Sequence, residues 1–112
     1  MASPDEIWLI DFGDRFPGEP AHHRPALVIG PSTIYGTGFP FVIVVPGTTT
    51  RRQLGLHVEV EPTRENGLRD VTYFQCELLR SISRRRLVTR LGAIEPGTVV
   101  AVDRVVRRLL GH

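Results

Sequence analysis

The sequence predicts a mainly β fold: a small antiparallel barrel of the SH3-like type, closed by one C-terminal helix. Short apolar runs recur between turn residues from residue 6 to residue 94. Residues 57–61 alternate strictly between polar and valine positions, which is the period of a half-buried strand. A long helical spacing of apolar residues occurs only near the C-terminus, after Pro96. Short strands separated by turns also fit a β-sandwich, which is the alternative architecture.

The first three expected strands cover residues 6–12, 25–30 and 41–45. A polar loop at residues 18–25 separates the first two, and Pro25 fits the first position of a strand because it lacks an amide donor. The third run is almost entirely β-branched, which favours a strand that is buried on both faces.

The fourth expected strand, residues 57–61, points its valines inward and its polar residues outward. Asn66-Gly67 marks a turn, and the next strand runs over residues 70–79 and continues to residue 82. A short helical turn at residues 83–87 and a strand at residues 90–94 follow. The final helix begins at Pro96 and ends at Gly111. Its apolar face comprises Val99, Val102, Val106 and Leu109.

The length and the charge of the chain limit the number of domains and the kinds of partner that it can bind. A chain of 112 residues forms one domain, residues 1–112. Its net charge is only +2, yet all 14 basic residues are arginines. Arginine offers planar donors that suit phosphate, so a phosphate-bearing partner is plausible and any basic surface must be local.

Cysteine use and hydropathy indicate the compartment. The single cysteine, Cys76, lies in an apolar run, which predicts a buried, inert thiol in a reducing cytosol. No apolar run approaches the roughly 18 residues that span a bilayer, and the N-terminus shows no basic segment followed by an apolar one. We therefore expect a cytoplasmic protein with no membrane partner.

Two polar loops hold the chemically useful side chains. Arg24 directly precedes the second expected strand and Thr48 directly follows the third. If these strands are antiparallel neighbours, both loops lie at one edge of the sheet. A common ligand there would be within reach of Glu19, His22, His23, Arg24, Thr48, Thr49, Arg51 and Arg52.

Guanidinium and hydroxyl groups suit a phosphodiester. Cleavage of RNA by its own 2′-hydroxyl needs the least from such a set of side chains, since arginine and threonine supply charge stabilisation and Glu19 or a histidine moves protons.

These residues also have purely structural interpretations. They are an ion-pair role for Arg24, a loop-cap role for residues 48–50, a solvated face at residues 84–86 and an ordinary hairpin connection at residues 18–25. A zinc site is disfavoured because the adjacent His22 and His23 point to opposite sides of an extended chain. Neither a Gly-x-Ser-x-Gly nucleophile motif nor a glycine-rich phosphate loop occurs.

Four motifs together resemble the MazF/PemK family in order and spacing. They are Glu6-Ile7-Trp8 with Asp11-Phe12, Gly18-Glu19-x-Ala21-x-x-Arg24-Pro25-Ala26-Leu27-Val28, Val45-Pro46-x-Thr48-Thr49, and Cys76-Glu77-x-Leu79-Arg80-Ser81-Ile82. These proteins are mRNA endoribonucleases, the toxins of toxin–antitoxin pairs. The resemblance implies an SH3-like barrel of the CcdB/PemK kind and a homodimer that binds single-stranded RNA. It also implies sequence-selective, metal-independent cleavage that leaves a 2′,3′-cyclic phosphate and a 5′-hydroxyl, with no cofactor.

The resemblance maps the catalytic arginine onto Arg24, the catalytic threonine onto Thr48 with Thr49 as the substitute, and the acidic loop residue onto Glu19. Substrate-binding candidates are His23, Thr49, Arg51 and Arg52 from the loops, and Glu77 and Arg80 from the last motif. The sequence departs from the family pattern at Pro17, Pro20, His22 and Leu78, which concerns base preference more than the reaction. A cognate antitoxin is the implied protein partner. The rival functions are a non-catalytic gyrase-poisoning toxin of the same fold and a plain RNA-binding module.

Overall fold

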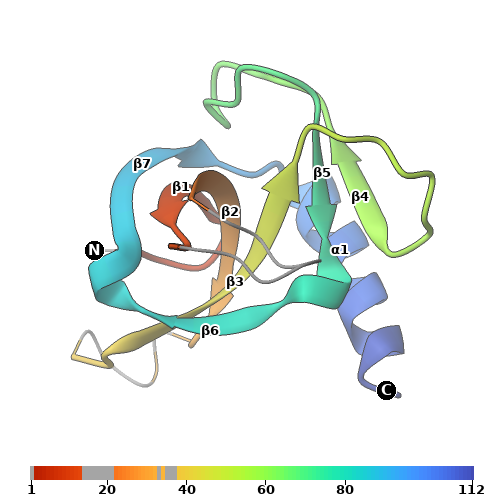
Figure 1. Cartoon of the computed structure of the whole chain (residues 1–112). Coiled ribbons are helices and arrows are strands. Elements are labelled where there is room, and N and C mark those ends of the chain that lie inside the picture. The colour runs from red at the N-terminus through yellow and green to blue at the C-terminus, as the bar shows by residue number, and fades with distance from the viewer. Residues whose placement is uncertain (1, 14–21, 33, 35–37) are drawn as a thin grey trace.

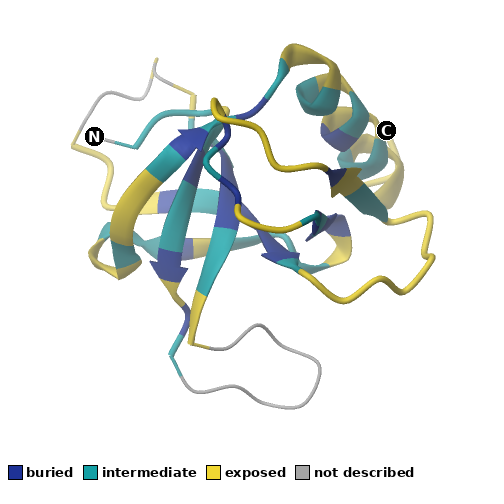
Figure 2. Cartoon of the chain, turned by 90° about the horizontal axis from the view of Figure 1, so that it is seen from above, coloured by how far each residue is buried: buried dark blue, intermediate teal, exposed yellow. Residues whose placement is uncertain are grey.

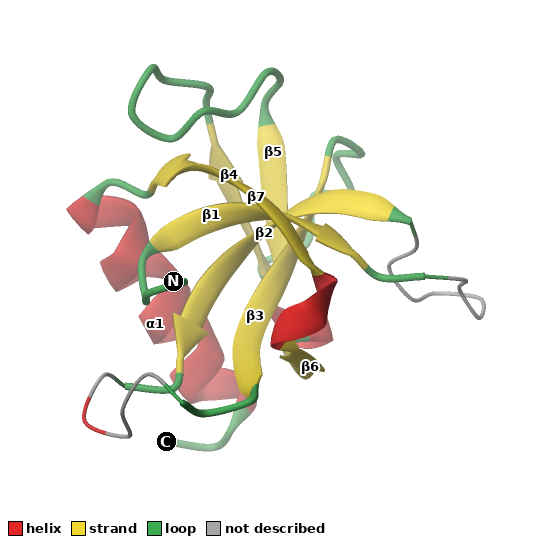
Figure 3. Cartoon of the chain, turned by 90° about the vertical axis from the view of Figure 1, so that its left-hand side faces the viewer, coloured by secondary structure: helices red, strands yellow, loops and turns green. Residues whose placement is uncertain are grey.

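The computed structural model describes residues 2–13, 22–32, 34 and 38–112. Figure 1 shows a strongly bent antiparallel sheet with α1 at one side. The described strands are β1 (Glu6–Asp11), β2 (His23–Gly30), β3 (Phe41–Thr48), β4 (His57–Val60), β5 (Thr72–Gln75), β6 (Arg80–Ser83) and β7 (Leu87–Ala93). Two 3₁₀ turns, η2 (Cys76–Leu78) and η3 (Arg84–Arg86), flank β6, and α1 (Pro96–Leu109) ends the chain (Figure 3).

β3 is the central strand of the sheet. The strand order is β4-β5-β3-β2-β1-β7, and β6 also pairs with β3. β3 uses one edge for β2, while its other edge pairs first with β6 and then, at Gly47 and Thr48, with β5. All these pairings are antiparallel. This confirms the predicted mainly antiparallel fold with a C-terminal helix, although hydrogen bonds among the described residues do not join β4 to β7 and close the barrel.

The core divides into two clusters because neighbouring residues of a strand face opposite sides of the sheet. Leu27 and Val45 belong to the cluster that α1 covers, together with Val102 of the helix. Ala26 and Val44 belong to the second cluster, which lies on the other face. Residues 26–28 of β2 and residues 44–47 of β3 are each buried without interruption, as strands covered on both faces require (Figure 2, buried residues dark blue).

The helix begins at Pro96 and is followed by Gly111 in the left-handed region (φ +79°), as predicted. Val102 is fully buried, and Val99 and Val106 pack beside it. Leu109, the last apolar residue of this face, is 41% exposed, so the described chain does not bury it in its own core. The last helical turn extends past the sheet that the preceding turns cover.

Several predicted strand boundaries are wrong. β2 starts at His23, so Arg24 lies within the strand, and β3 continues to Thr48. The single long strand expected from residue 70 to residue 82 is divided by η2. This turn lets β5 pair with β4 and the end of β3, while β6 pairs with the beginning of β3. The helical turn expected at residues 83–87 is confirmed at η3, where Ser83 Oγ accepts a hydrogen bond from the Arg85 amide at 3.2 Å.

The prediction that Cys76 is buried is confirmed. Cys76 is a free, buried thiol with 1% of its surface exposed. Burial, together with the neighbouring charge of Glu77, raises the pKa of this thiol to about 11, so it is protonated and unreactive at neutral pH. Across the described residues, no helix is both long and apolar enough to span a membrane.

Candidate functional site

The structure brings Arg24 and Thr48 to the same edge of the sheet. Ala26 pairs with Pro46 and Leu27 with Val45 in antiparallel register. Continuing that register by two residues places Arg24 opposite Thr48. The carbonyl oxygen of Pro25 confirms the continuation, since it lies 3.2 Å from the point where a Cβ on Gly47 would stand.

The two threonines at this edge have different surroundings. Strand alternation places Arg24 and Thr48 on the same face as Ala26 and Val44. Pro25 and Thr49 instead line a cavity of about 340 Å³ together with Leu68 and Thr72. Thr48 therefore shares its face with Arg24, whereas Thr49 belongs to the cavity behind it.

The Thr48 hydroxyl has a defined orientation. Its Oγ1 accepts a hydrogen bond from the Thr50 amide at 3.2 Å, which is the loop-cap geometry that the sequence allowed. A hydroxyl has one donor and two acceptor positions, so this bond leaves its proton available for donation. The structural role of Thr48 and a role in binding a phosphate oxygen are therefore compatible.

Arg24 is half-buried in β2, and no described residue forms a hydrogen bond or ion pair with its side chain. The alternative role as a structural ion-pair partner thus has no partner in the described part of the chain. Glu19, the acidic candidate, lies outside the described residues.

The other loop candidates are exposed. The His23 Nε2 atom is 3.9 Å from a carboxylate oxygen of Asp11, and 59% of its side chain is exposed. Thr49, Arg51 and Arg52 are exposed after the end of β3. These side chains are therefore solvent-exposed near the Arg24–Thr48 edge.

Glu77 and Arg80 occupy structured positions. Arg80 lies in β6 opposite Val44, and its guanidinium carbon is 5.8 Å from the centre of the Phe12 ring. A carboxylate oxygen of Glu77 lies 2.8 Å from His57 Nε2, within hydrogen-bonding distance. Glu77 is therefore held by a second residue instead of being free for substrate.

His57 was missed at the sequence level. The alternation of residues 57–61 predicts an outward His57, but only 3% of its side chain is exposed. Gln75 pairs with it across the strands, and the buried His57 Nδ1 and Gln75 Oε1 atoms both lack a hydrogen-bond partner among the residues that the structure describes. Tyr73 of β5 lies opposite Thr48. Only the strand register, which the sequence does not contain, relates these residues to the site.

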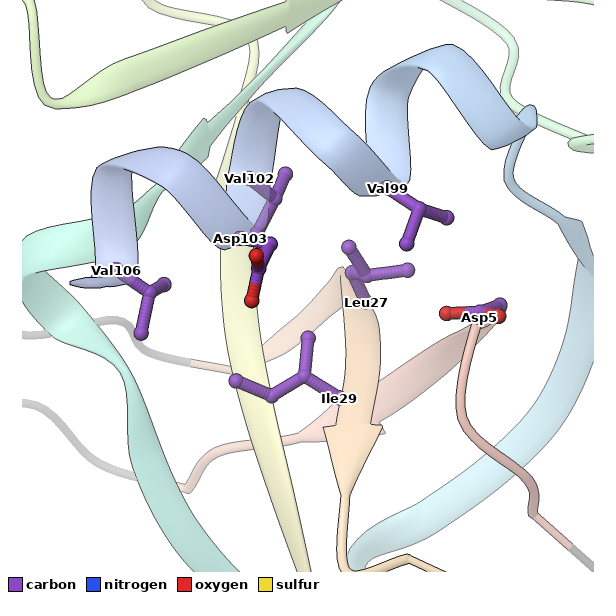
Figure 4. Close-up of a pocket in the computed structure, with 7 residues that line it drawn as sticks. All are labelled: Asp5, Leu27, Ile29, Val99, Val102, Asp103 and Val106. Atoms are coloured by element: carbon purple, nitrogen blue, oxygen red, sulfur yellow. The ribbon is translucent and has the colours of Figure 1, made fainter.

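A second cavity, of about 160 Å³, lies between α1 and β2 (Figure 4). Leu27 and Ile29 of β2 line it beneath the helix, Asp5 lies to one side, and Asp103 projects from the helix beside Val102. Asp103 pairs with Arg107 at 2.9 Å. This cavity is a packing gap under the helix, separate from the Arg24–Thr48 edge. No group of three or more histidine, cysteine, aspartate or glutamate residues among those described is placed to hold a metal ion.

The fold and this edge place the protein in the class of MazF-fold β proteins. MazF from Deinococcus radiodurans is 20% identical, with a TM-score of 0.82 over 99% of this chain and 97% of that one. An endoribonuclease from a mycobacterial species, solved in complex with its cognate antitoxin, is 20% identical with a TM-score of 0.80, over 99% and 96% of the two chains. The Mycobacterium tuberculosis toxin MazF-mt6 is 21% identical with a TM-score of 0.75, over 95% and 96%.

The sequence match is more specific than the shared fold. Residues 3–110 match the family of PemK-like, MazF-like toxins of type II toxin–antitoxin systems. The chain belongs to this family, as the four sequence motifs indicate.

Proposed function

We propose that this protein is a toxin endoribonuclease that cleaves single-stranded mRNA at selected sequences by a metal-independent reaction. The observation that carries the proposal is the placement of Arg24 opposite Thr48, with a guanidinium that no described residue engages and a hydroxyl whose proton is available. Family membership supports the same activity, and one structural neighbour is itself described as an endoribonuclease.

In the proposed reaction the 2′-oxygen attacks the adjacent phosphorus and the bond from phosphorus to the 5′-oxygen breaks. The 2′-hydroxyl proton passes to a base, for which Glu19 and His23 are the candidates, and the departing 5′-oxygen takes a proton from the other of these two groups or from water. Arg24 stabilises the extra negative charge of the phosphorane, and Thr48 donates to a non-bridging oxygen. The products are a 2′,3′-cyclic phosphate and a 5′-hydroxyl.

Arg24 acts through its charge in this scheme. Its guanidinium stays protonated at any working pH, so it is a poor proton donor and a constant electrostatic partner. The phosphates or bases that flank the cleaved bond would be bound by Thr49, Arg51, Arg52 and Arg80. Because Glu77 is already paired with His57, its contribution to RNA binding would be made by the pair.

We also propose a cognate antitoxin and a homodimeric state. MazF of Deinococcus radiodurans has been solved with MazE, and the mycobacterial endoribonuclease with its antitoxin. An extended acidic segment of an antitoxin would neutralise the exposed arginines near the edge and cover it.

The test is incubation of the purified protein with a long single-stranded RNA in excess chelator. Discrete fragments with 5′-hydroxyl and 2′,3′-cyclic phosphate ends are expected, and Arg24→Ala should abolish them while Arg104→Ala, on the exposed face of α1, should not. Intact RNA with a mobility shift would identify an RNA-binding module instead. Intact RNA without a shift would favour the non-catalytic toxin.

A further inference from the structure

The cavity of about 340 Å³ behind the Arg24–Thr48 edge combines an apolar wall with charged groups at its mouth. Leu9, Leu68 and Leu91 supply the wall, and Arg69 and Asp70 also line it. Leu68 is 8% exposed, whereas Arg69 and Asp70 are exposed. The volume is within the range of about 300–1,000 Å³ that is typical of small-molecule sites.

The two charged groups are available to a ligand. Within the described part of the chain, neither the Arg69 guanidinium nor the Asp70 carboxylate has a hydrogen bond or ion pair. The backbone carbonyl of Asp70, in contrast, accepts from Thr72 Oγ1 at 3.0 Å, which anchors this segment. A donor and an acceptor are thus held side by side on a fixed backbone.

The position of the cavity connects it to the proposed cleavage site. Pro25 and Thr49 line it, and each directly follows one of the two proposed catalytic residues in the chain. The cavity therefore opens on the opposite face of these strand ends from Arg24 and Thr48, and an RNA strand that turns around this edge could place a phosphate between Arg24 and Thr48 and one of its bases in the cavity. The negative charge of Asp70 repels a phosphate, so the group inside the cavity should be a base.

We propose that this cavity binds a guanine base of the RNA strand whose phosphate lies between Arg24 and Thr48, an inference that rests on the proposed ribonuclease function. Guanine alone offers both charged groups a two-point partner: its O6 and N7 accept from arginine, while N1–H and the N2 amino group donate to a carboxylate. In single-stranded RNA both of these base edges are accessible. The leucine side chains contact the faces of the ring.

The binding test uses the four ribonucleoside 5′-monophosphates and the methyl NMR signals of Leu9, Leu68 and Leu91 in the full chain. Guanosine monophosphate should shift these signals at concentrations about tenfold lower than the other three nucleotides. Asp70→Asn should remove that preference, and Arg64→Gln, in the same loop but outside the cavity lining, should retain it. Equal binding of all four nucleotides, or no shift of these methyl groups with any of them, would overturn the proposal.

A second measurement separates this inference from the proposed function. The 5′-hydroxyl ends produced from a mixed transcript should show guanine enriched at one fixed position relative to the cut. Asp70→Asn and Arg69→Gln should each reduce this enrichment about tenfold while the cyclic phosphate product persists. Cleavage without guanine enrichment overturns the guanine site and leaves the ribonuclease intact. Guanine-selective binding without any cleavage supports the site and refutes the ribonuclease.

Discussion

Two polar regions of this molecule contrast in how fully their hydrogen-bonding groups are used. Asn66 is completely buried, its Oδ1 accepts from the amides of Thr63 and Leu68 at 2.9 and 3.0 Å, and its Nδ2 donates to Glu61 O and Glu95 Oε1 at 2.9 and 3.2 Å. These four bonds fill the capacity of the amide.

The Arg24–Thr48 edge has the opposite character. Arg24 has no described partner for its donors, and Thr48 accepts one bond while retaining its proton. A polar group that is saturated within the protein stabilises the fold, whereas an unsaturated one on a rigid strand end is available to a ligand. Mutations in the two regions should therefore affect different properties, and the following predictions test this difference.

The largest effect is expected at the unsaturated edge. Arg24→Ala should lower the rate of RNA cleavage about 10²–10³-fold, because it removes the charge that stabilises the phosphorane. Its free energy of unfolding should change by less than about 0.5 kcal/mol, as is usual where no internal contact is lost. Single-turnover cleavage and urea denaturation measure the two quantities. A large loss of stability would show that Arg24 is a structural residue.

The converse result is expected at Asn66. Asn66→Ala should lower the free energy of unfolding by about 3 kcal/mol, since it leaves buried amides and a carbonyl without partners. The protein that remains folded should cleave RNA at the rate of the unmodified chain. Urea denaturation and activity per folded molecule provide the test, with Arg64→Gln as a surface control in the same loop. A cleavage defect in folded Asn66→Ala would remove the distinction between the two regions.

A smaller effect should separate the two threonines. Thr48→Val should reduce the cleavage rate about tenfold or more, because a hydrogen bond to a charged oxygen is worth about 1.5–3 kcal/mol. Thr49→Val should instead change the base preference and affect the rate less, since Thr49 lines the cavity. Comparing kcat and cut-site sequences for both variants measures this. The reverse order of effects would identify Thr49 as the phosphate donor.

The smallest effect concerns stability at acidic pH and involves Glu6, whose carboxylate is likewise hydrogen-bonded within the protein. Burial alone would raise the pKa of Glu6, but hydrogen bonds from Trp8, the Ser3 amide and Arg90 outweigh it and lower that pKa below 4.5. A lowered pKa in the folded state gives stability that is present above pH 4.5 and is lost as the pH falls through the folded value. Because Arg90 is half exposed, we expect less than about 1 kcal/mol. Urea denaturation of Glu6→Gln at pH 7 and pH 3 should show a difference from the original chain only at pH 7.

The sequence predicted the antiparallel fold and the terminal helix because strand and helix periods are local properties. It could not predict the break at Cys76–Leu78, since the apolar run continues through it and the turn is stabilised by pairing with two different parts of β3. The buried His57 was missed for a related reason: alternation separates two faces but does not show that both are covered. Arg24 and Thr48 could be identified from the sequence motifs and from their places at the ends of two successive strands. Their positions relative to Tyr73 and to the cavity depend on the pairing register of the strands, which the sequence does not give.

The absence of a side chain at Gly47 also has a consequence for how this protein can vary. A Cβ there would lie 2.6 Å from Thr72 Cγ2 and 3.2 Å from the Pro25 carbonyl, so even alanine would push neighbouring strands apart. The spacing between the Arg24 guanidinium and the Thr48 hydroxyl is thus governed by a position that has no side chain. Randomising this codon and selecting for toxicity should recover glycine almost exclusively.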